Sequence, residues 1–283
     1  MNKKYKRVFS INLQPGYRNY TVKDLQDIKG KKKLTQILVS DALEASAAEE
    51  AGIDLILAKP DENVPLIRKA APKTFMTVSI PFIKYSSKED IVKKALELVE
   101  HGADSIHCGS WNLNFMKYLN EFKIPFQGHA GLVPRRSTWI GGVKAFGKNS
   151  SEASKLLSDI KDIEDTGAWG VEVECVPEDI LGEVTRETKL LTLSIGSGKK
   201  SDVQFLFAED ILGCSTIDTP RHAKMYANFN KLNAQIQKER IKAFKKFNFE
   251  VKKGIFPGKR QSISVDKIEL NKFKKLIRDK KDN

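Results

Sequence analysis

The sequence has 283 residues, of which 40% are hydrophobic and 30% charged, which excludes an intrinsically disordered chain and suffices for one large α/β domain or two small ones. Its formal net charge of +13 comes from 49 Lys and Arg spread along the chain against 36 Asp and Glu, without zinc-finger spacing or a basic-region helix, so we predict a solvated lysine surface and no nucleic-acid partner. No apolar run approaches the roughly 20 residues of a membrane span and the N-terminal residues lack an apolar signal region, so we expect a cytoplasmic protein without a membrane partner.

Short β-rich runs alternate with helical segments along the whole chain. Seven runs are predicted clearly as strands, at 35–41, 54–60, 75–82, 104–109, 124–131, 169–177 and 190–198, with a weak eighth candidate at 214–217. Helical segments are predicted at 42–52, 63–71, 86–102, 112–122, 151–167 and 177–188, and a long helix at 231–251 comes last. Because the strands are apolar almost throughout, we predict a parallel sheet covered by helices.

Three helix-to-strand junctions share one pattern. In each, a glycine (Gly52, Gly102 or Gly167) stands where a helix ends in a left-handed residue, and an apolar strand follows at once. Counting the weak candidate, the chain has eight strand–helix units, and this number favours an α/β fold of the (β/α)8 TIM-barrel type over an open doubly wound sheet. The GxGxxG motif of a dinucleotide-binding doubly wound sheet is also absent from the sequence. We expect residues 1–258 to form a single barrel domain with an N-terminal lead-in, and 259–283 to form a basic tail with a short amphipathic helix.

In a TIM barrel the active site lies at the carboxyl ends of the strands. The candidate positions at the predicted strand ends are Ser40 and Asp41, Lys59–Asp61, Ser79, His107–Gly109, His129, Glu172, Glu174 and the loop Gly196–Gly198. We expect the chemistry to come from these residues.

Glu174 is the strongest candidate for that chemistry. In the run WGVEVECVP, the alternation directs Glu172 and Glu174 to one side of the strand, near its end. Two carboxylates that face a barrel interior are costly unless they are used or paired. We interpret Glu174 as functional, and leave open whether Glu172 is functional or pairs with a Lys, an Arg or backbone N–H groups.

Two histidines and a glycine-rich segment complete the candidates. His129 lies between glycines that let a ligand approach the backbone, although a bond to a backbone carbonyl explains it equally well. His107 has three interpretations: it donates a hydrogen bond to a substrate carboxylate, it binds a metal ion, or it only fills the mouth of the barrel with a polar side chain. The segment 139–148 carries Lys144 among glycines, a composition typical of a mobile lid but also of a simple corner.

Five segments in succession resemble the signature segments of the ketopantoate hydroxymethyltransferase family. They are GHAGLVP (128–134), GGVKAFGK (141–148), LLSDIKDIEDTGAWGVEVECVP (156–177), SIGSGKKSDVQFLFAEDILG (194–213) and KKGIFPG (252–258). The resemblance runs from about residue 21 to 258 and is strongest from Gly128 onward. It implies a barrel of the phosphoenolpyruvate/pyruvate superfamily that forms homo-oligomers, decamers in the family. It also implies transfer of a hydroxymethyl group from 5,10-methylenetetrahydrofolate to 3-methyl-2-oxobutanoate, giving 2-dehydropantoate for pantothenate biosynthesis.

The resemblance also implies roles for individual residues. The Glu of the family's ECVP motif, here Glu174, is the general base that removes a proton beside the ketone. His129 matches the family's His near the bound 2-oxo acid. The family's Mg²⁺ stabilises the enolate through the substrate's keto and carboxylate oxygens. We expect Ser40 to contribute to substrate binding, and Lys144, Gly196 and Gly198 to form the loops around it.

The family's metal-binding positions carry different residues in this chain. Its Asp-Ser pair falls on Pro60 and Asp61, its next Asp on Ser79, its Lys on His107 and its Glu on Gly109. Only Asp61 offers a carboxylate to a hard cation there, after a one-residue shift. His107 favours a softer divalent ion or donates a hydrogen bond to the substrate, so Asp61, Ser79 and His107 define an altered oxo-acid pocket.

Three functions are open from the sequence. The first is the family reaction in this altered pocket, and the second is enolate or C–C bond chemistry on another 2-oxo acid, with or without a metal. The third is a non-catalytic homologue that acts as an assembly or regulatory subunit. Glu174 and His129 favour an enzyme over the third function.

Overall fold

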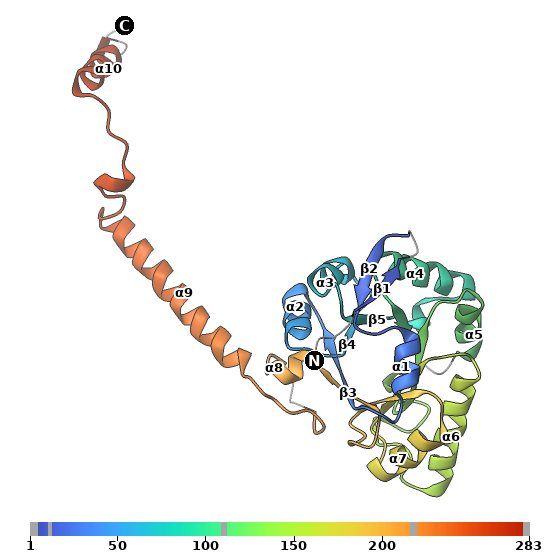
Figure 1. Ribbon diagram of the computed structural model, residues 1–283. Coiled ribbons are helices and arrows are strands. Elements are labelled where there is room, and N and C mark those ends of the chain that lie inside the picture. The colour runs from blue at the N-terminus through green and yellow to red at the C-terminus, as the bar shows by residue number, and fades with distance from the viewer. Residues whose placement is uncertain (1–4, 11–12, 109–111, 216–219, 280–283) are drawn as a thin grey trace. The chain divides into compact units, whose positions relative to one another are not determined.

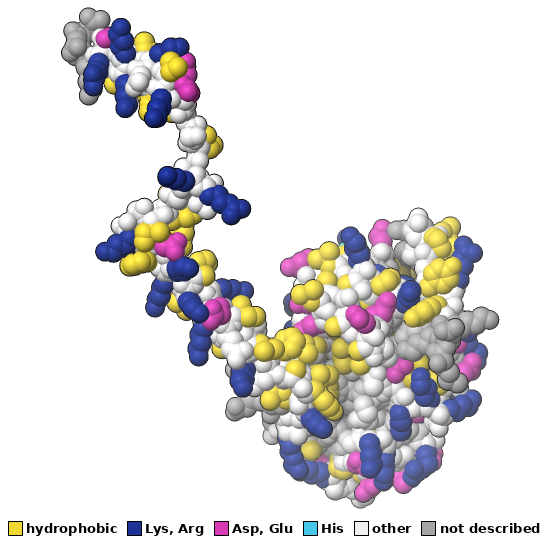
Figure 2. Space-filling view, turned by 60° about the vertical axis from the view of Figure 1, so that its left-hand side comes forward, with side chains coloured by type: hydrophobic (Ala, Val, Ile, Leu, Met, Phe, Trp, Pro, Cys, Tyr) yellow, Lys and Arg dark blue, Asp and Glu magenta, His cyan; other side chains and the backbone are white. Residues whose placement is uncertain are grey.

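The computed structural model describes residues 5–10, 13–108, 112–215 and 220–279 (Figure 1). The chain divides into two compact units, one ending at Ala227 and the other beginning at Asn228. None of the helices in these described ranges is both long and apolar enough to cross a membrane. Lys and Arg side chains lie dispersed among Asp and Glu on the face shown in Figure 2, as a solvated charged surface requires.

Eight parallel strands of the first unit close into a barrel in the order β10-β3-β4-β5-β6-β7-β8-β9. Their bounds are β3 (Leu34–Val39), β4 (Leu55–Ala58), β5 (Phe75–Ser79), β6 (Ser105–His107), β7 (Phe126–Gly131), β8 (Gly170–Glu174), β9 (Leu191–Ile195) and β10 (Val203–Phe207). Pairing of β10 with β3 closes the ring, from Val203 beside Leu34 to Phe207 beside Leu38. The predicted (β/α)8 architecture is confirmed.

The eighth strand lies elsewhere than predicted. It is β10, whereas the weak candidate was 214–217, of which Cys214 belongs to no strand and 216–217 lie outside the described residues. β10 has the alternation of a strand, since Val203 and Phe205 are buried and Gln204 is exposed. A helix follows this strand directly, which obscures the change of period in the sequence.

Helices surround the strands of the barrel (Figure 1). They are α1 (Val22–Ile28), α2 (Ala42–Glu50), α3 (Val64–Ala70), α4 (Lys88–Glu100), α5 (Leu113–Glu121), α6 (Ser150–Glu164), α7 (Glu178–Glu187) and α8 (Ala208–Leu212), with 3-10 turns at Phe82–Lys84 and Pro134–Arg136. A hairpin of β1 (Lys6–Phe9) and β2 (Pro15–Arg18) precedes them. Gly52, Gly102 and Gly167 have positive φ where α2, α4 and α6 end, which confirms the predicted junctions.

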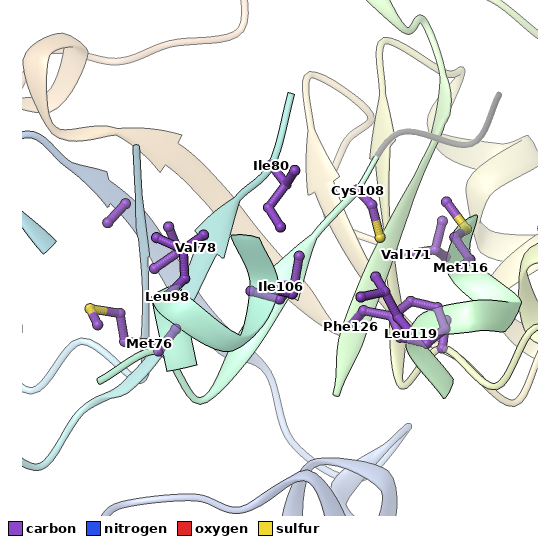
Figure 3. Packing of buried hydrophobic residues seen from close by; sticks show 14 of the residues in the cluster. Met76, Val78, Ile80, Leu98, Ile106, Cys108, Met116, Leu119, Phe126 and Val171 are labelled. Carbon is purple, nitrogen blue, oxygen red and sulfur yellow. The ribbon is translucent and has the colours of Figure 1, made fainter. Parts of the chain in front are cut away.

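A large apolar layer lies between the strands and the helices. Figure 3 shows the part where Val78, Ile106 and Val171 of the strands meet Leu98 of α4 and Leu119 of α5. Strands and helices that share such a buried layer are held at fixed positions, because their side chains are closely packed and cannot move independently. The carboxyl ends of the strands are therefore held at fixed positions relative to one another.

The barrel interior has an apolar floor beneath its carboxyl-terminal half. The side chains that form the floor are Leu25, Leu34, Leu55, Phe75, Trp169, Leu191, Leu193 and Val203. Phe75 and Trp169 meet edge to face, with ring centroids 5.6 Å apart, and the indole N–H of Trp169 donates to Oγ of Ser105. The floor separates the mouth of the barrel from the solvent at its other end.

The ring of helices is incomplete beside the last two strands. The connection from β9 to β10 consists only of residues 196–202, which form no helix, and α8 after β10 has five residues. Among the described residues of the first unit, the short helix α8 contacts β10 and β3, and α2 contacts β3.

The second unit contains α9 (Phe229–Lys252), a 3-10 turn at Lys259–Gln261 and α10 (Lys267–Asp279). Neither helix has a buried residue. The two compact units divide between Ala227 and Asn228, and the expected barrel domain of residues 1–258 stays a prediction. The amphipathic helix predicted in the tail is present as α10.

Candidate active site

Four neighbouring strands, β5 to β8, carry polar side chains at alternate positions. They are Thr77 and Ser79 on β5, Ser105 and His107 on β6, Gln127 and His129 on β7, and Glu172 and Glu174 on β8. Side chains alternate across a strand, so the residues between these positions pack outward against the helices. The register places Ser79 beside His107 and His129 beside Glu172.

Two histidines and two glutamates form one cluster near the carboxyl ends of these strands. Nε2 of His107 lies 3.2 Å from Oε2 of Glu172. Nε2 of His129 lies 3.6 Å from Oε1 of Glu172 and 3.1 Å from Oε2 of Glu174. Nδ1 of His107 also lies 3.2 Å from Oγ of Ser79. Since Glu172 is 5% and His129 8% exposed, water screens their charges little.

Burial and mutual charge act in opposite directions on the two most buried members. Burial would lower the pKa of His129, but the carboxylates of Glu172 and Glu174 outweigh it and raise that pKa above its ordinary value. Burial would raise the pKa of Glu172, but His129 and His107 outweigh it and lower that pKa. Both directions favour an imidazolium paired with a carboxylate.

The backbone holds β7 and β8 close together at the cluster. Gly131 pairs with Glu174 and has a φ of +81°, in the left-handed region. A Cβ at this position would lie 2.5 Å from the carbonyl oxygen of Glu174, which accepts a 2.8 Å hydrogen bond from the N–H of Leu132. Only glycine permits this approach.

One set of three side chains could hold a metal ion. His107, His129 and Glu172 each offer one ligand atom, and these atoms all lie within 4.8 Å of one another. Asp61, the metal ligand expected from the sequence, is not a member of this set.

Several other expected site residues lie apart from the cluster. Asp61 is exposed, and its Oδ1 accepts a hydrogen bond from the N–H of Asn63 in a local turn. The N–H of Ser40 donates to Oε2 of Glu44 at the start of α2. Gly109 lies outside the described residues. The structure therefore brings together Ser79, His107 and His129 with Glu174, whereas the hydrogen bonds of Asp61 and Ser40 join them to Asn63 and Glu44.

The loops around the cluster are anchored beside β8. The N–H of Phe146 donates to the carbonyl of Cys175 at 3.0 Å, which holds the segment 139–148 against the end of β8, while Lys144 is exposed. Gly196 and Gly198 have φ of +67° and +76°. A Cβ at Gly196 would lie 3.2 Å from Sγ of Cys175, so this loop also approaches the strand end closely.

A cleft of about 1020 Å³ adjoins the cluster. It begins at Cys175, directly after Glu174, and extends past Gly196 to residues 204–206 of β10 and 35–37 of β3. Its lining includes the basic side chains of Lys148, Arg221 and Lys224 and the ring of Tyr226. The His and Glu side chains of the cluster do not line it, so the cleft is a neighbouring space rather than the reacting centre.

The sequence indicated the members of this cluster more clearly than their partners. Glu172 was left open between function and pairing, and its pairing with two histidines was not anticipated. Polar residues at alternate positions of four successive strands were a readable signal. Spacing alone, however, does not state which strands are neighbours.

Solved structures show the same fold. A putative phosphonomutase from Burkholderia cenocepacia superposes with a TM-score of 0.54 at 11% identity, covering 67% of this chain and 93% of that protein. A 2,3-dimethylmalate lyase of the PEP mutase/isocitrate lyase superfamily gives 0.50 at 10% identity, covering 67% and 81%. At these identities the likeness concerns the barrel alone.

Sequence relatives are more specific. The 3-methyl-2-oxobutanoate hydroxymethyltransferase of Kosmotoga olearia is 34% identical, over 84% of this chain and 95% of the relative. That of Pyrococcus furiosus is 32% identical, over 92% and 98%. The profile of the family described as ketopantoate hydroxymethyltransferase matches residues 62–259. These matches confirm the resemblance seen in the sequence motifs: the chain is an enzyme of the ketopantoate hydroxymethyltransferase family.

Proposed function

We propose that this protein transfers a hydroxymethyl group from 5,10-methylenetetrahydrofolate to 3-methyl-2-oxobutanoate, with Glu174 as the general base. The observation that carries this proposal is the pairing of Glu174 with His129 across 3.1 Å at the carboxyl end of β8, in a chain of this family. The reaction must remove a proton from the carbon beside the ketone, and a held carboxylate is suited to accept it.

The two glutamates have environments that suit different roles. The side chain of Glu174 is 16% exposed and lies nearest the adjoining cleft, whereas that of Glu172 is 7% exposed and lies between the histidines. Glu174 is the one that a substrate can reach. With no ion on its Nε2, His129 is a positioning residue for Glu174, because a hydrogen bond from that nitrogen fixes the direction of the carboxylate.

Once Glu174 has taken the proton, the enolate carbon attacks the methylene carbon of the donor, and a C–C bond forms as one of the two C–N bonds of that carbon breaks. A water molecule then displaces the second nitrogen and supplies the hydroxyl group. The proton held by Glu174 and one proton of the water end on the two nitrogens, so that tetrahydrofolate leaves.

Ser79 lies at the end of β5 beside the cluster, where its hydroxyl is suited to contact the acid. Ser40 and Asp61 are proposed to contact the substrate without taking part in the reaction. We place the folate in the adjoining cleft. There the ring of Tyr226 offers a stacking surface, and Lys148 and Lys224 offer positive charge to the carboxylates of the folate's own glutamate tail.

The Mg²⁺ that the family implies does not fit the side chains gathered here. Mg²⁺ binds oxygen ligands in octahedral geometry, whereas the converging set offers two imidazoles and one carboxylate. Asp61 is exposed and engaged by Asn63. No step of the proposed mechanism is therefore assigned to Mg²⁺.

Hydrogen exchange tests the base directly. The full-length protein in D₂O should exchange the C3 proton of 3-methyl-2-oxobutanoate without folate, and form 2-dehydropantoate when 5,10-methylenetetrahydrofolate is added. Glu174→Gln should lower both rates by about 10²- to 10⁴-fold, the range of general-base catalysis. Glu183→Gln, an exposed α7 carboxylate paired with Arg186, is the matched control and should change neither rate. Wild-type exchange by Glu174→Gln would refute the assignment.

The altered ligand positions support a second candidate, enolate chemistry on another 2-oxo acid. The same exchange assay with a panel of 2-oxo acids separates the two. Fast exchange of another acid, with none of 3-methyl-2-oxobutanoate, would favour this candidate.

A further inference from the structure

We propose that His107, His129 and Glu172 bind one divalent transition-metal ion of the borderline class, such as Zn²⁺, Fe²⁺ or Co²⁺, instead of the Mg²⁺ used by the family. The ligand atoms are Nε2 of both histidines and the carboxylate of Glu172. Because it concerns the same pocket, this inference rests on the proposed function for its substrate, but binding of the metal is measured without turnover.

The spacing of the ligand atoms fits such an ion. A tetrahedral ion with bonds of about 2.1 Å to N and O ligands keeps those ligands about 3.4 Å apart. The two distances to Glu172 are 3.2 Å from His107 and 3.6 Å from His129. The two distances to Glu172 match this separation, and all three ligand atoms lie within 4.8 Å of one another, close enough for one shared ion after a small adjustment.

Two of the ligand atoms have unused capacity. Nε2 of His107 and Oε2 of Glu172 are buried and form an ion-pair contact with each other at 3.2 Å, and neither atom has a further hydrogen-bond partner in the part of the chain that the structure describes. Buried polar atoms are normally bonded, because leaving them without a partner forfeits their interaction with water. A cation between them would satisfy both.

The other nitrogen of His107 is held as in metal sites. Nδ1 lies 3.2 Å from Oγ of Ser79, the register neighbour on β5. A hydrogen bond at Nδ1 orients the ring and directs the Nε2 lone pair toward the ion. Ser79 is thus a positioning residue for this ligand.

The kinds of ligand select the class of ion. Imidazole nitrogens suit Zn²⁺, Fe²⁺ and Co²⁺, whereas Mg²⁺ prefers carboxylate, carbonyl and water oxygens. Three protein ligands also leave further positions open, as in catalytic rather than structural zinc sites. The open coordination positions of the ion suit a ligand with two adjacent oxygens, such as the keto and carboxylate oxygens of a 2-oxo acid.

Binding of the ion and the present hydrogen bond exclude each other at one atom. Nε2 of His129 either carries the proton shared with Glu174 or binds the ion. A bound ion would therefore replace the proton between these two side chains, and leave the carboxylate of Glu174 free.

Cobalt is a direct probe of the site. Full-length protein is stripped with a chelator, dialysed and titrated with Co²⁺, and both the bound metal and the visible absorption are measured. We expect one Co²⁺ per chain with the intense bands of a four- or five-coordinate site, displacement by equimolar Zn²⁺, and no displacement by a thousandfold excess of Mg²⁺. Lack of stoichiometric binding, or displacement by equimolar Mg²⁺, would overturn the proposal.

Variants locate the ion. His107→Ala and Glu172→Gln should each weaken Co²⁺ binding at least about a hundredfold, since loss of a mere supporting contact already costs 10- to 100-fold. His101→Ala, at the exposed end of α4, is the matched control and should bind as the wild type does. Thermal melting of each apo variant distinguishes loss of a ligand from loss of fold. Unchanged affinity in folded His107→Ala would also overturn the proposal. Stoichiometric Co²⁺ without exchange of any 2-oxo acid would instead refute the proposed function and leave the metal site standing.

Discussion

The barrel interior is divided between two sets of strands. On β5 to β8 the positions near the carboxyl ends are polar, and they form the cluster of His107, His129, Glu172 and Glu174. On β9, β10, β3 and β4 the matching positions form an apolar cluster of Leu57, Ile195 and Phe205, with Leu38 and Phe207 packed against it. One periodicity produces both sides, because every second residue of each strand points inward.

The difference shows how a reactive centre is kept inside a packed core. The apolar side supplies burial and excludes water, which strengthens charge interactions on the other side. On the polar side, burial of a charged side chain costs free energy unless a side chain of opposite charge lies beside it. Its stability therefore depends on the pairing of the histidines with the glutamates. Stability and chemistry are thus assigned to opposite walls of the same space.

Truncation of the apolar wall should give the largest effect. Phe205 is 2% exposed, and Phe205→Ala should reduce the free energy of unfolding by about 3–5 kcal/mol through lost burial and the cavity left behind. Urea denaturation measures this loss. Phe207→Ala, at a less buried position of the same strand, is the comparison and should cost less. Equal costs would contradict the description of the wall as a packed core.

The polar wall should instead respond to pH. The lowered pKa of Glu172 contributes stability that is present above its ordinary value near 4.5 and is lost as pH falls through the folded value. The raised pKa of His129 contributes stability that is present below its ordinary value near 6.5 and is lost as pH rises through the folded value. The stability due to this pair should therefore be greatest between about pH 4.5 and 6.5, the two ordinary values.

Urea denaturation of chelator-treated protein across this pH range tests the pair. Glu172→Gln removes the charge that His129 faces, so the dependence above pH 6 should become weaker or reverse. Phe207→Ala leaves the pair intact and should keep the wild-type dependence. An identical pH profile for wild type and Glu172→Gln would show that the wall does not work through this pair.

A smaller effect is expected within the polar wall itself. Ser79→Ala removes the contact to Nδ1 of His107 and should weaken Co²⁺ binding by about 10-fold, with little change in unfolding free energy. Ser79→Thr keeps a hydroxyl and should restore most of the affinity. A change in stability with no change in Co²⁺ affinity would mean that Ser79 serves packing rather than the histidine.

The fold follows from local signals in the sequence, and its exceptions have local causes. Gly52, Gly102 and Gly167 marked the helix ends because positive φ has a residue preference that can be read directly. The eighth strand was placed too late because 203–207 runs straight into α8 without a turn. The long helix predicted at 231–251 is present as α9 (Phe229–Lys252).

The site shows a different limit of sequence reasoning. Alternation in WGVEVE indicated that Glu172 and Glu174 share a face, and both do contact His129. The approach of His107 to Glu172 joins β6 to β8 across the intervening β7, and depends on the curvature of a closed barrel rather than on sequence spacing. Asp61 was assigned by correspondence with the family, which carries over a position but not the path of a loop.

Gly131 gives the cluster a property that its side chains do not have. Because the distance between β7 and β8 at this point is set by a missing Cβ, the scaffold that spaces His129 from the two glutamates is independent of what those side chains are. Neighbouring strand ends can then exchange one functional group for another, which is the change that the sequence motifs predict at Ser79 and His107, without moving Glu174. In evolutionary terms, the glycine allows the ligands of the site to be revised while its geometry is inherited.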